Sequence, residues 1–284
     1  MYTLIVSVSC SVAVSILLKI ARQQRIEIDQ AIAVNYLLAA ALCLAVLRPD
    51  PASLLRPDTP WWILAVLGVL LPGIFLAMAA AVRHAGIVLS DAAQRLSLLI
   101  PLAASFLIFG EAASTGKLAG IAVALVALAC LLLRPRRQAA ASGELGKSAA
   151  LLLCVWAGYG CIDVLFKQLA KSGADFASSL FSAFALAALL MILYLALRRC
   201  AWSMRNVTAG LVLGLLNFSN IYFYIRAHQV YPHNPTLVFS AMNIGVISLG
   251  AVVGAGFFKE KLSWMNVLGI VLAIAAIVIL MQHM

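Results

Sequence analysis

The sequence has few charged residues, no paired cysteines and no clustered metal ligands. Charged side chains make up 11% of its 284 residues and hydrophobic ones 64%, whereas a water-soluble domain carries about 25% charged and 45–50% apolar residues. Large soluble domains are therefore excluded. None of the six cysteines forms a CxxC pair, which argues against a disulfide framework or a metal site. We expect no metal and no cofactor.

Long apolar runs fill almost the whole chain. A membrane-spanning helix needs roughly 20 mainly apolar residues, and the runs between charged residues, proline and glycine give ten such segments. Their ranges are 2–20, 30–47, 61–82, 87–109, 115–133, 148–170, 176–197, 206–228, 236–258 and 262–281. The first run has no basic residues before it, so we interpret it as a span and not as a signal peptide. The sequence predicts an all-α polytopic membrane protein with ten transmembrane helices.

The two halves of the sequence resemble each other. Shifted by 149 positions, residues between 109 and 131 meet identical residues between 258 and 280, at Phe109, Glu111, Ser114, Gly120, Ile121, Ala124, Ala127 and Leu131. Each half would hold five spans, and an odd number inverts the second copy relative to the first. We predict a first repeat over 1–137, a linker over 138–147 and an inverted second repeat over 148–284.

These motifs together resemble the drug/metabolite transporter superfamily, in its ten-helix, EamA-like branch. The most specific parts are the two Glu-x-x-Ser-x5-Gly-Ile segments that begin at Glu111 and Glu260, and a lysine late in the first span of each half, Lys19 and Lys167. The resemblance implies a transporter of small organic solutes in the bacterial inner membrane, with both termini in the cytoplasm. Relatives usually carry an arginine where this chain has Asn35-Tyr36.

The charges give a different orientation from the resemblance. Thirteen of the 20 Lys and Arg lie at the odd-numbered connections and six at the even-numbered ones. By the positive-inside rule, this places both termini outside the cytoplasm. The basic residues lie at the ends of apolar runs, so we expect no nucleic-acid partner.

Ionisable residues inside spans are the first candidates for transport, because a charge facing lipid costs at least about 2.5–3.5 kcal/mol. Asp91 and Arg95 lie four residues apart in the fourth span, as do Asp163 and Lys167 in the sixth. Each pair could neutralise itself on one helix face or line a water-filled path. Only the first half has the charge of Arg95, because its repeat equivalent is Ile244, so we favour a functional role for this residue. Asp163 and Asp91 are the candidates for proton coupling.

Polar and helix-breaking residues indicate where a solute would bind. Pro101 interrupts the fourth span where the second repeat has Gly250, and Pro72-Gly73 interrupts the third span opposite Phe218-Ser219. Interruptions at matching positions of two repeats indicate a midplane site. The eighth span places Asn217, Asn220 and Tyr224 on one helix face. The predicted binding residues are Arg95, Gln94, Asn217, Asn220, Tyr224, Asn243, Asn35, Tyr36, Tyr159, Lys19 and Lys167.

We expect a secondary transporter, in the lipid bilayer, that exports an amino-acid-like anionic or zwitterionic solute by alternating access, as a monomer or homodimer. The alternative is a flippase for lipid carriers or other phosphate-bearing head groups, in which Arg95 would contact the phosphate. The sequence offers no Ser-His-Asp set, no Gly-rich phosphate loop and no metal-ligand spacing, so we do not expect an enzyme.

Overall fold

The computed structural model describes residues 2–50, 59–97, 99–107, 115–132, 142–171, 175–231 and 235–282, and in these ranges the regular structure is helical. The helices are α1 (Tyr2–Gln23), α2 (Ile28–Leu42) with a π-helical end η1 (Cys43–Leu47), α4 (Trp61–Ala85), α5 (Ile87–Leu96), α6 (Leu99–Leu107), α7 (Thr115–Leu132), α8 (Ser142–Lys171), α9 (Phe176–Leu197), α10 (Met204–Val230), α11 (Pro235–Ala251) with a π-helical end η3 (Val252–Phe257), and α12 (Trp264–Gln282).

The helices are long and apolar because most of the apolar runs in the sequence are about 20 residues long, the length of a membrane-spanning helix. Within the described ranges, six helices are long and apolar enough to cross a membrane, and they are the stretches Tyr2–Ala21, Ile28–Leu47, Trp61–Ala85, Gly146–Phe166, Phe176–Leu197 and Met204–Ala227. Shorter apolar helices cover Leu118–Cys130, Ala241–Phe257 and Trp264–Leu280. Large apolar side chains such as Val69, Leu189 and Val271 are exposed, which a lipid environment accommodates. The protein is an all-α polytopic membrane protein.

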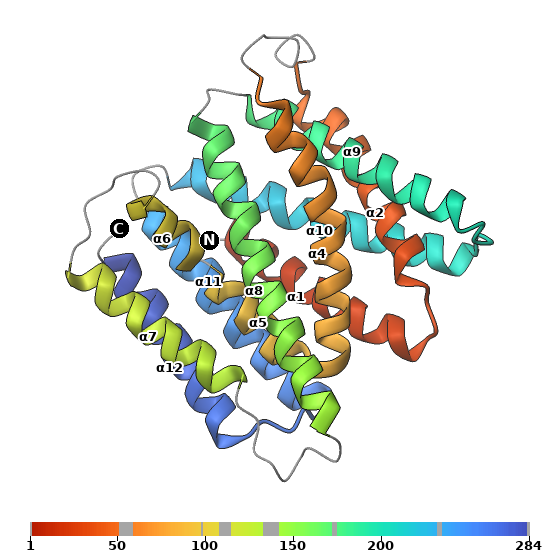
Figure 1. The fold of residues 1–284 in the computed structure, drawn as a ribbon. Helices are drawn as coiled ribbons and strands as arrows, with labels where there is room; N and C mark the ends of the chain where they lie inside the picture. Colours follow the sequence, from red (N-terminus) through yellow and green to blue (C-terminus); the bar gives the residue numbers. More distant parts are fainter. Residues whose placement is uncertain are drawn as a thin grey trace.

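The helices form a bundle whose two flanks are made by helix pairs (Figure 1). Helices α7 and α12 lie side by side at one end, and α2 packs against α9 at the other. Between these pairs, α10 packs against α1 and α2, while α4 packs against α8 and α9. Helix α5 contacts α8 and α11 near the centre.

Small residues let these helices approach closely. The alanines shared by the two repeat motifs, Ala124 and Ala127 on α7 and Ala273 and Ala276 on α12, are all buried in one apolar cluster. On α10, a Cβ atom at Gly210 would lie 2.7 Å from the backbone oxygen of Ala31 on α2. Close backbone contact of this kind is how helices associate in lipid, where no hydrophobic force drives them together.

The fourth predicted span is broken, and the third is not. Helix α5 ends at Leu96 and α6 begins at Leu99, so Pro101 falls in the first turn of α6, where its missing N–H leaves no hydrogen bond unmade. Helix α4 runs through Pro72 without a break, so the predicted interruption of the third span is wrong. The neighbouring Gly73 is exposed, and a lone proline can be accommodated in a membrane helix.

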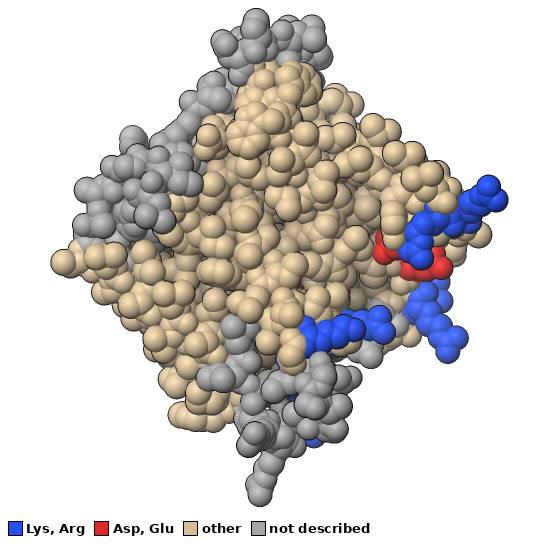
Figure 2. Space-filling model, in the orientation of Figure 1, with Lys and Arg blue, Asp and Glu red and all other residues tan. Residues whose placement is uncertain are grey.

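The visible charged residues gather at one end of the bundle. In Figure 2 most of the visible Lys and Arg atoms lie along the right and lower right, and most of the remaining described surface is uncharged. The α1–α2 and α9–α10 connections lie on this side of Figure 1. We call it the basic end. The two chain termini lie away from it.

Candidate functional site

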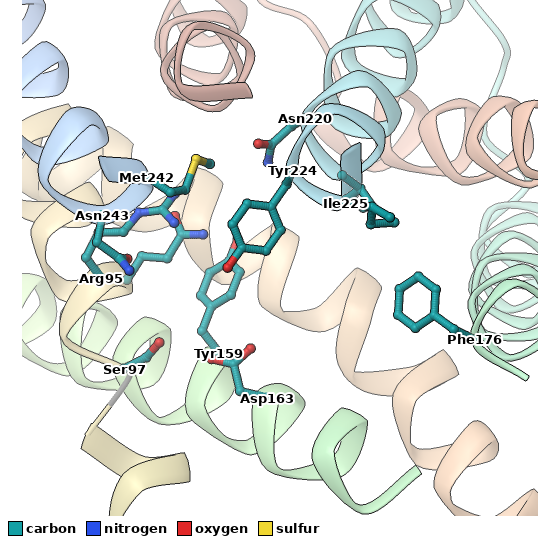
Figure 3. Close-up of a pocket in the computed structure, with 12 residues that line it drawn as sticks. Arg95, Ser97, Tyr159, Asp163, Phe176, Asn220, Tyr224, Ile225, Met242 and Asn243 are labelled. Atoms are coloured by element: carbon teal, nitrogen blue, oxygen red, sulfur yellow. The ribbon is translucent and has the colours of Figure 1, made fainter. Parts of the chain in front are cut away.

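A cavity of about 500 Å³ lies between α5, α8, α10 and α11. Seven of the residues predicted to bind solute or couple protons line it: Gln94, Arg95, Tyr159, Asp163, Asn220, Tyr224 and Asn243. Figure 3 shows Arg95, Met242 and Asn243 on one side of the cavity, the rings of Tyr159 and Tyr224 at its centre, and Phe176 on the far side. The cavity therefore carries a guanidinium, a carboxylate, amides and aromatic rings on opposing walls.

A second cavity of about 220 Å³ adjoins the first. Gln94, Tyr159, Asp163, Asn220 and Ile221 line both. Its remaining wall is mostly apolar and includes Val14, Leu71, Ile74, Phe75, Met78, Phe166 and Phe184. The site thus consists of two connected chambers. We call the first the polar chamber, after Arg95, Ser97 and Asn243, which line only it, and the second the apolar chamber, after the aliphatic and aromatic side chains that line only it.

Arg95 and Asp91 are held by helix α1 and not by each other. Arg95 Nη2 donates to Ser11 Oγ at 2.8 Å, and Ser15 Oγ donates to Asp91 Oδ1 at 2.6 Å. In the described part of the chain no ion pair joins Asp91 to Arg95. Since Arg95 lines the cavity while Asp91 is buried, the guanidinium keeps donors available for a solute.

A row of polar side chains runs along α1, with one residue per helical turn. Besides Ser11 and Ser15, it includes Ser7, whose Oγ donates to Asn220 Oδ1 at 2.8 Å, and Lys19, which pairs with Glu260. The four side chains lie four residues apart and therefore on one face of α1. Sequence reasoning missed these serines, although polar residues at every fourth position of an apolar span are a signal that could have found them.

The predicted amide and ring residues of α2 and α10 lie in or behind the wall of the apolar chamber. Asn217 lines the apolar chamber and its Nδ2 donates to Asn35 Oδ1 at 3.2 Å. Asn35 is buried behind it and lines neither cavity. Tyr36 lines the apolar chamber, and its ring contacts Phe75 and Phe184 with centroids 6.1 and 6.0 Å away.

Asp163 is the carboxylate of the polar chamber. Although it lies between helices, its side chain is exposed, because it faces both cavities. Lys167 lies one turn further along α8, but its side chain is outside the described residues, and so is any pairing of it with Asp163.

Lys19 lies away from the cavities, at the basic end. Its ammonium pairs with Glu260 and lies 4.8 Å from the ring centre of Phe258. Glu260 also accepts hydrogen bonds from the backbone of α5, at 2.8 Å from Ile87 N and 3.2 Å from Val88 N. The acid is thus bound to the start of α5, a favourable place for negative charge.

The start of α12 uses other residues than Glu260. Ser263 Oγ accepts a hydrogen bond from Asn266 N at 3.1 Å, and Asn266 Oδ1 accepts one from Ser263 N at 3.2 Å. This reciprocal pair makes Ser263 the N-cap of α12. The repeat equivalents Glu111 and Ser114 lie outside the described residues.

The basic end is closed by a second contact between the halves. Gln30 on α2 and Asn206 on α10 are both buried, and Asn206 Nδ2 donates to Gln30 Oε1 at 3.0 Å. Gln30 Nε2 donates in turn to Ala201 O at 2.9 Å. A satisfied buried amide pair of this kind holds two helices in one register.

The fold and the site define an integral membrane protein of polytopic helical type with an internal, polar and charged cavity. No family model matches the chain. It is 50% identical over 287 aligned positions to an uncharacterized protein of Haemophilus influenzae (strain ATCC 51907 / DSM 11121 / KW20 / Rd), covering 98% of this chain and 96% of that protein. The chain belongs to the family of that protein.

Proposed function

We propose that the protein is a secondary transporter of small organic solutes that works by alternating access of two inverted halves. The observation that carries this proposal is the cavity on which Arg95 and Asp163 converge with the rings of Tyr159 and Tyr224. Ionisable residues at membrane depth usually serve substrate or ion pathways. We place the protein in or near the drug/metabolite transporter superfamily, as its repeated motifs suggest.

The helix contacts support ten spans in two related halves. Exchanging the halves would exchange α1 with α8, α2 with α9, α4 with α10, the α5–α6 pair with α11, and α7 with α12. The contacts follow this exchange: α2 packs on α10 as α9 packs on α4, and α1 packs on α10 as α8 packs on α4. Helices α7 and α12, and likewise α2 and α9, are exchange partners that contact each other.

A repeated glycine supports the same conclusion. Gly68 and Gly214 occupy equivalent positions in the two halves. A Cβ atom at Gly68 would contact Leu186 on α9, and one at Gly214 would contact Asn35 and Leu38 on α2. Equivalent glycines thus admit equivalent partner helices.

The break between α5 and α6 supports a binding site at this depth. Arg95 and Ser97, both at the break, line the cavity. Transporters commonly bind solutes where a spanning helix is discontinuous, because the freed backbone and side chains face a cavity and not lipid.

The two chambers favour a zwitterion with an apolar or flat side chain. Arg95 suits a carboxylate, which a guanidinium binds with two parallel hydrogen bonds, and Asp163 suits an ammonium group. The apolar chamber, at about 220 Å³, would take the side chain. An amino-acid-like metabolite has these three parts, and we propose that it is moved outward across a bacterial inner membrane.

A thermal-shift screen of the purified protein tests the proposal. The panel is L-phenylalanine, L-leucine, their amides without the carboxylate, the matching acids without the amine, and a soluble phospholipid head group. We expect the whole amino acids to raise the unfolding temperature, because a ligand that binds the folded state stabilises it, and Arg95→Ala to abolish the shift. Stabilisation by the head group alone would favour the flippase, and no shift by any compound would contradict the proposal.

A further inference from the structure

The polar residues between the cavity and the basic end form a second group, which centres on Asp91. Asp91 is 1% exposed. One of its carboxylate oxygens accepts from Ser15 Oγ at 2.6 Å, while Oδ2 is buried and has no hydrogen-bond partner in the described part of the chain. Burying an ionised carboxylate with an unpartnered oxygen costs free energy. A bound proton neutralises the group and removes the cost of burying the charge.

Three helices bring Asp91 and Glu260 within one helical turn of each other. On α5, Glu260 binds the backbone N–H of Ile87, four residues before Asp91. On α11 and its end η3, a Cβ atom at Gly250 would lie 2.8 Å from Asp91 Oδ2, and one at Gly254 would lie 3.0 Å from Glu260 Oε2. Residues four apart on a helix are neighbours about 5–6 Å apart. The two carboxylates therefore face adjacent turns of the same helix surface, formed by Gly250 and Gly254, which we call the glycine track.

Helix α1 covers the other side of this track in the same register. Ser15 bonds Asp91, and Lys19, one turn later, pairs with Glu260. The charged and titratable groups that face Asp91 are Arg95 on α5 itself, Glu260 before α12, and Tyr159 from α8. Lys19 from α1 pairs with Glu260. The track therefore leads from Arg95 in the cavity to the ion pair at the basic end.

We propose that Asp91 is the proton-binding site of this transporter and exchanges its proton with Glu260. The inference rests on the proposed function for its coupling role, but not for the proton site itself. In the exchange, the O–H bond of the Asp91 carboxyl breaks and one forms on a Glu260 oxygen, directly or through one water.

Proton transfer to Glu260 would open the basic end. A neutral Glu260 loses its attraction for Lys19 and for the N–H groups at the start of α5, which are the contacts that join α1, α5 and the η3–α12 connection. Protonation of Asp91 acts on the cavity as well, because it removes a negative charge one turn from Arg95 and leaves the guanidinium to a carboxylate solute. The same proton thus changes the affinity for the solute when it is on Asp91 and opens the basic end when it is on Glu260.

Infrared spectroscopy tests the proton site without any solute. We expect the wild-type protein to show the carbonyl stretch of a buried, protonated carboxylic acid, the Asp91→Asn variant to lack it, and the Asp163→Asn variant to keep it. Asp29→Asn, at a half-buried carboxylate near Arg198, is the matched control and should leave the band unchanged. Should Asp91→Asn fail to fold, Ser15→Ala must still shift the band, because it removes the hydrogen bond to that carboxyl.

L-Phenylalanine binding tests the coupling. The affinity of the wild type should change about 5- to 150-fold between mildly acidic and mildly alkaline buffer, the usual range for two coupled sites, and the affinity of Asp91→Asn should not change. A band that survives Asp91→Asn, or a binding response to Na⁺ in place of pH, would overturn the proton site. If L-phenylalanine fails to bind the wild type, the proposed solute class fails, and the infrared result still decides the proton site.

Discussion

Single side chains decide how the two halves meet at the cavity. The α5–α6 break leaves the carbonyl of Leu96 at the end of α5, and Trp156 Nε1 on α8 donates to it at 3.0 Å. Two residues from different halves thus complete one hydrogen bond beside Arg95 and Tyr159. An indole N–H, which can only donate, suits a carbonyl at the end of a helix.

We predict that Trp156→Phe destabilises the protein by about 1–3 kcal/mol, the typical range for a buried carbonyl left without its donor. The phenyl ring keeps much of the apolar packing, so the loss reports the hydrogen bond. Denaturation in detergent measures it. Trp202→Phe is the control, because Trp202 is exposed outside the spans and its replacement should change the stability by less than about 0.5 kcal/mol. Equal stabilities of both variants would contradict this role for Trp156.

Residue patterns predicted the members of the site better than their partners. The spacing of Asn217, Asn220 and Tyr224 placed them on one face of α10. Asn220 lines both chambers, Tyr224 lines the polar chamber and Asn217 lines the apolar one. The spacing of Asp91 and Arg95 equally allowed an ion pair, yet each bonds a serine of α1. A partner 76 to 84 positions away in the chain is set by helix packing, which local spacing does not encode.

Approximate helix positions followed from the apolar runs, whereas breaks within helices did not. The sequence predicts one interruption at Pro72-Gly73 and another at Pro101, and nothing in the local sequence distinguishes the two. Helix α4 is continuous through Pro72, whereas the fourth span is broken before Pro101. Tertiary contacts decide between these outcomes, because a break needs side chains such as Trp156 to satisfy the freed backbone.

Close contact between α2 and α10 depends on glycine, and we predict that Gly210→Ala disrupts it. The new Cβ would lie 2.7 Å from Ala31 O and 2.6 Å from Val34 Cβ. A backbone oxygen cannot move aside as a side chain can, so we expect a loss of at least about 1–3 kcal/mol and a lower unfolding temperature in detergent.

Gly73→Ala on α4 is the matched control for this prediction. No heavy atom lies within 4 Å of its added Cβ, and alanine is about 1 kcal/mol better than glycine in a helix. The control should therefore fold as well as the wild type or better. A Gly210→Ala variant as stable as Gly73→Ala would mean that α2 and α10 do not approach as closely as described.

On the scale of the whole molecule, the closed contacts lie at one end and the cavity extends toward the other. Lys19–Glu260 and Gln30–Asn206 both join the halves at the basic end. The cavity wall reaches Phe176, the first residue of α9, which begins at the opposite end. In the alternating-access proposal, this arrangement is a state with the basic end shut.

The orientation of the molecule decides which state this is, and we predict that both termini lie outside the cytoplasm. The physical reason is the excess of Lys and Arg at the odd-numbered connections, which the positive-inside rule keeps in the cytoplasm. Fusions at residue 284 test this: alkaline phosphatase, active outside the cytoplasm, should be active there, and green fluorescent protein should be dark. Fusions after residue 137 should give the opposite result.

Inverted results from these fusions would favour the orientation that the family resemblance implies, and they would also reverse the state assigned to the proposed transporter. With the termini outside, the Lys19–Glu260 closure faces the cytoplasm, so the proposed solute export would begin by opening that pair, and a proton reaching Glu260 would start a cycle. With the termini inside, the same pair would be the external gate, and its opening would release solute. The site residues are the same in both cases, but relative to these residues the proton gradient across the membrane has the opposite direction.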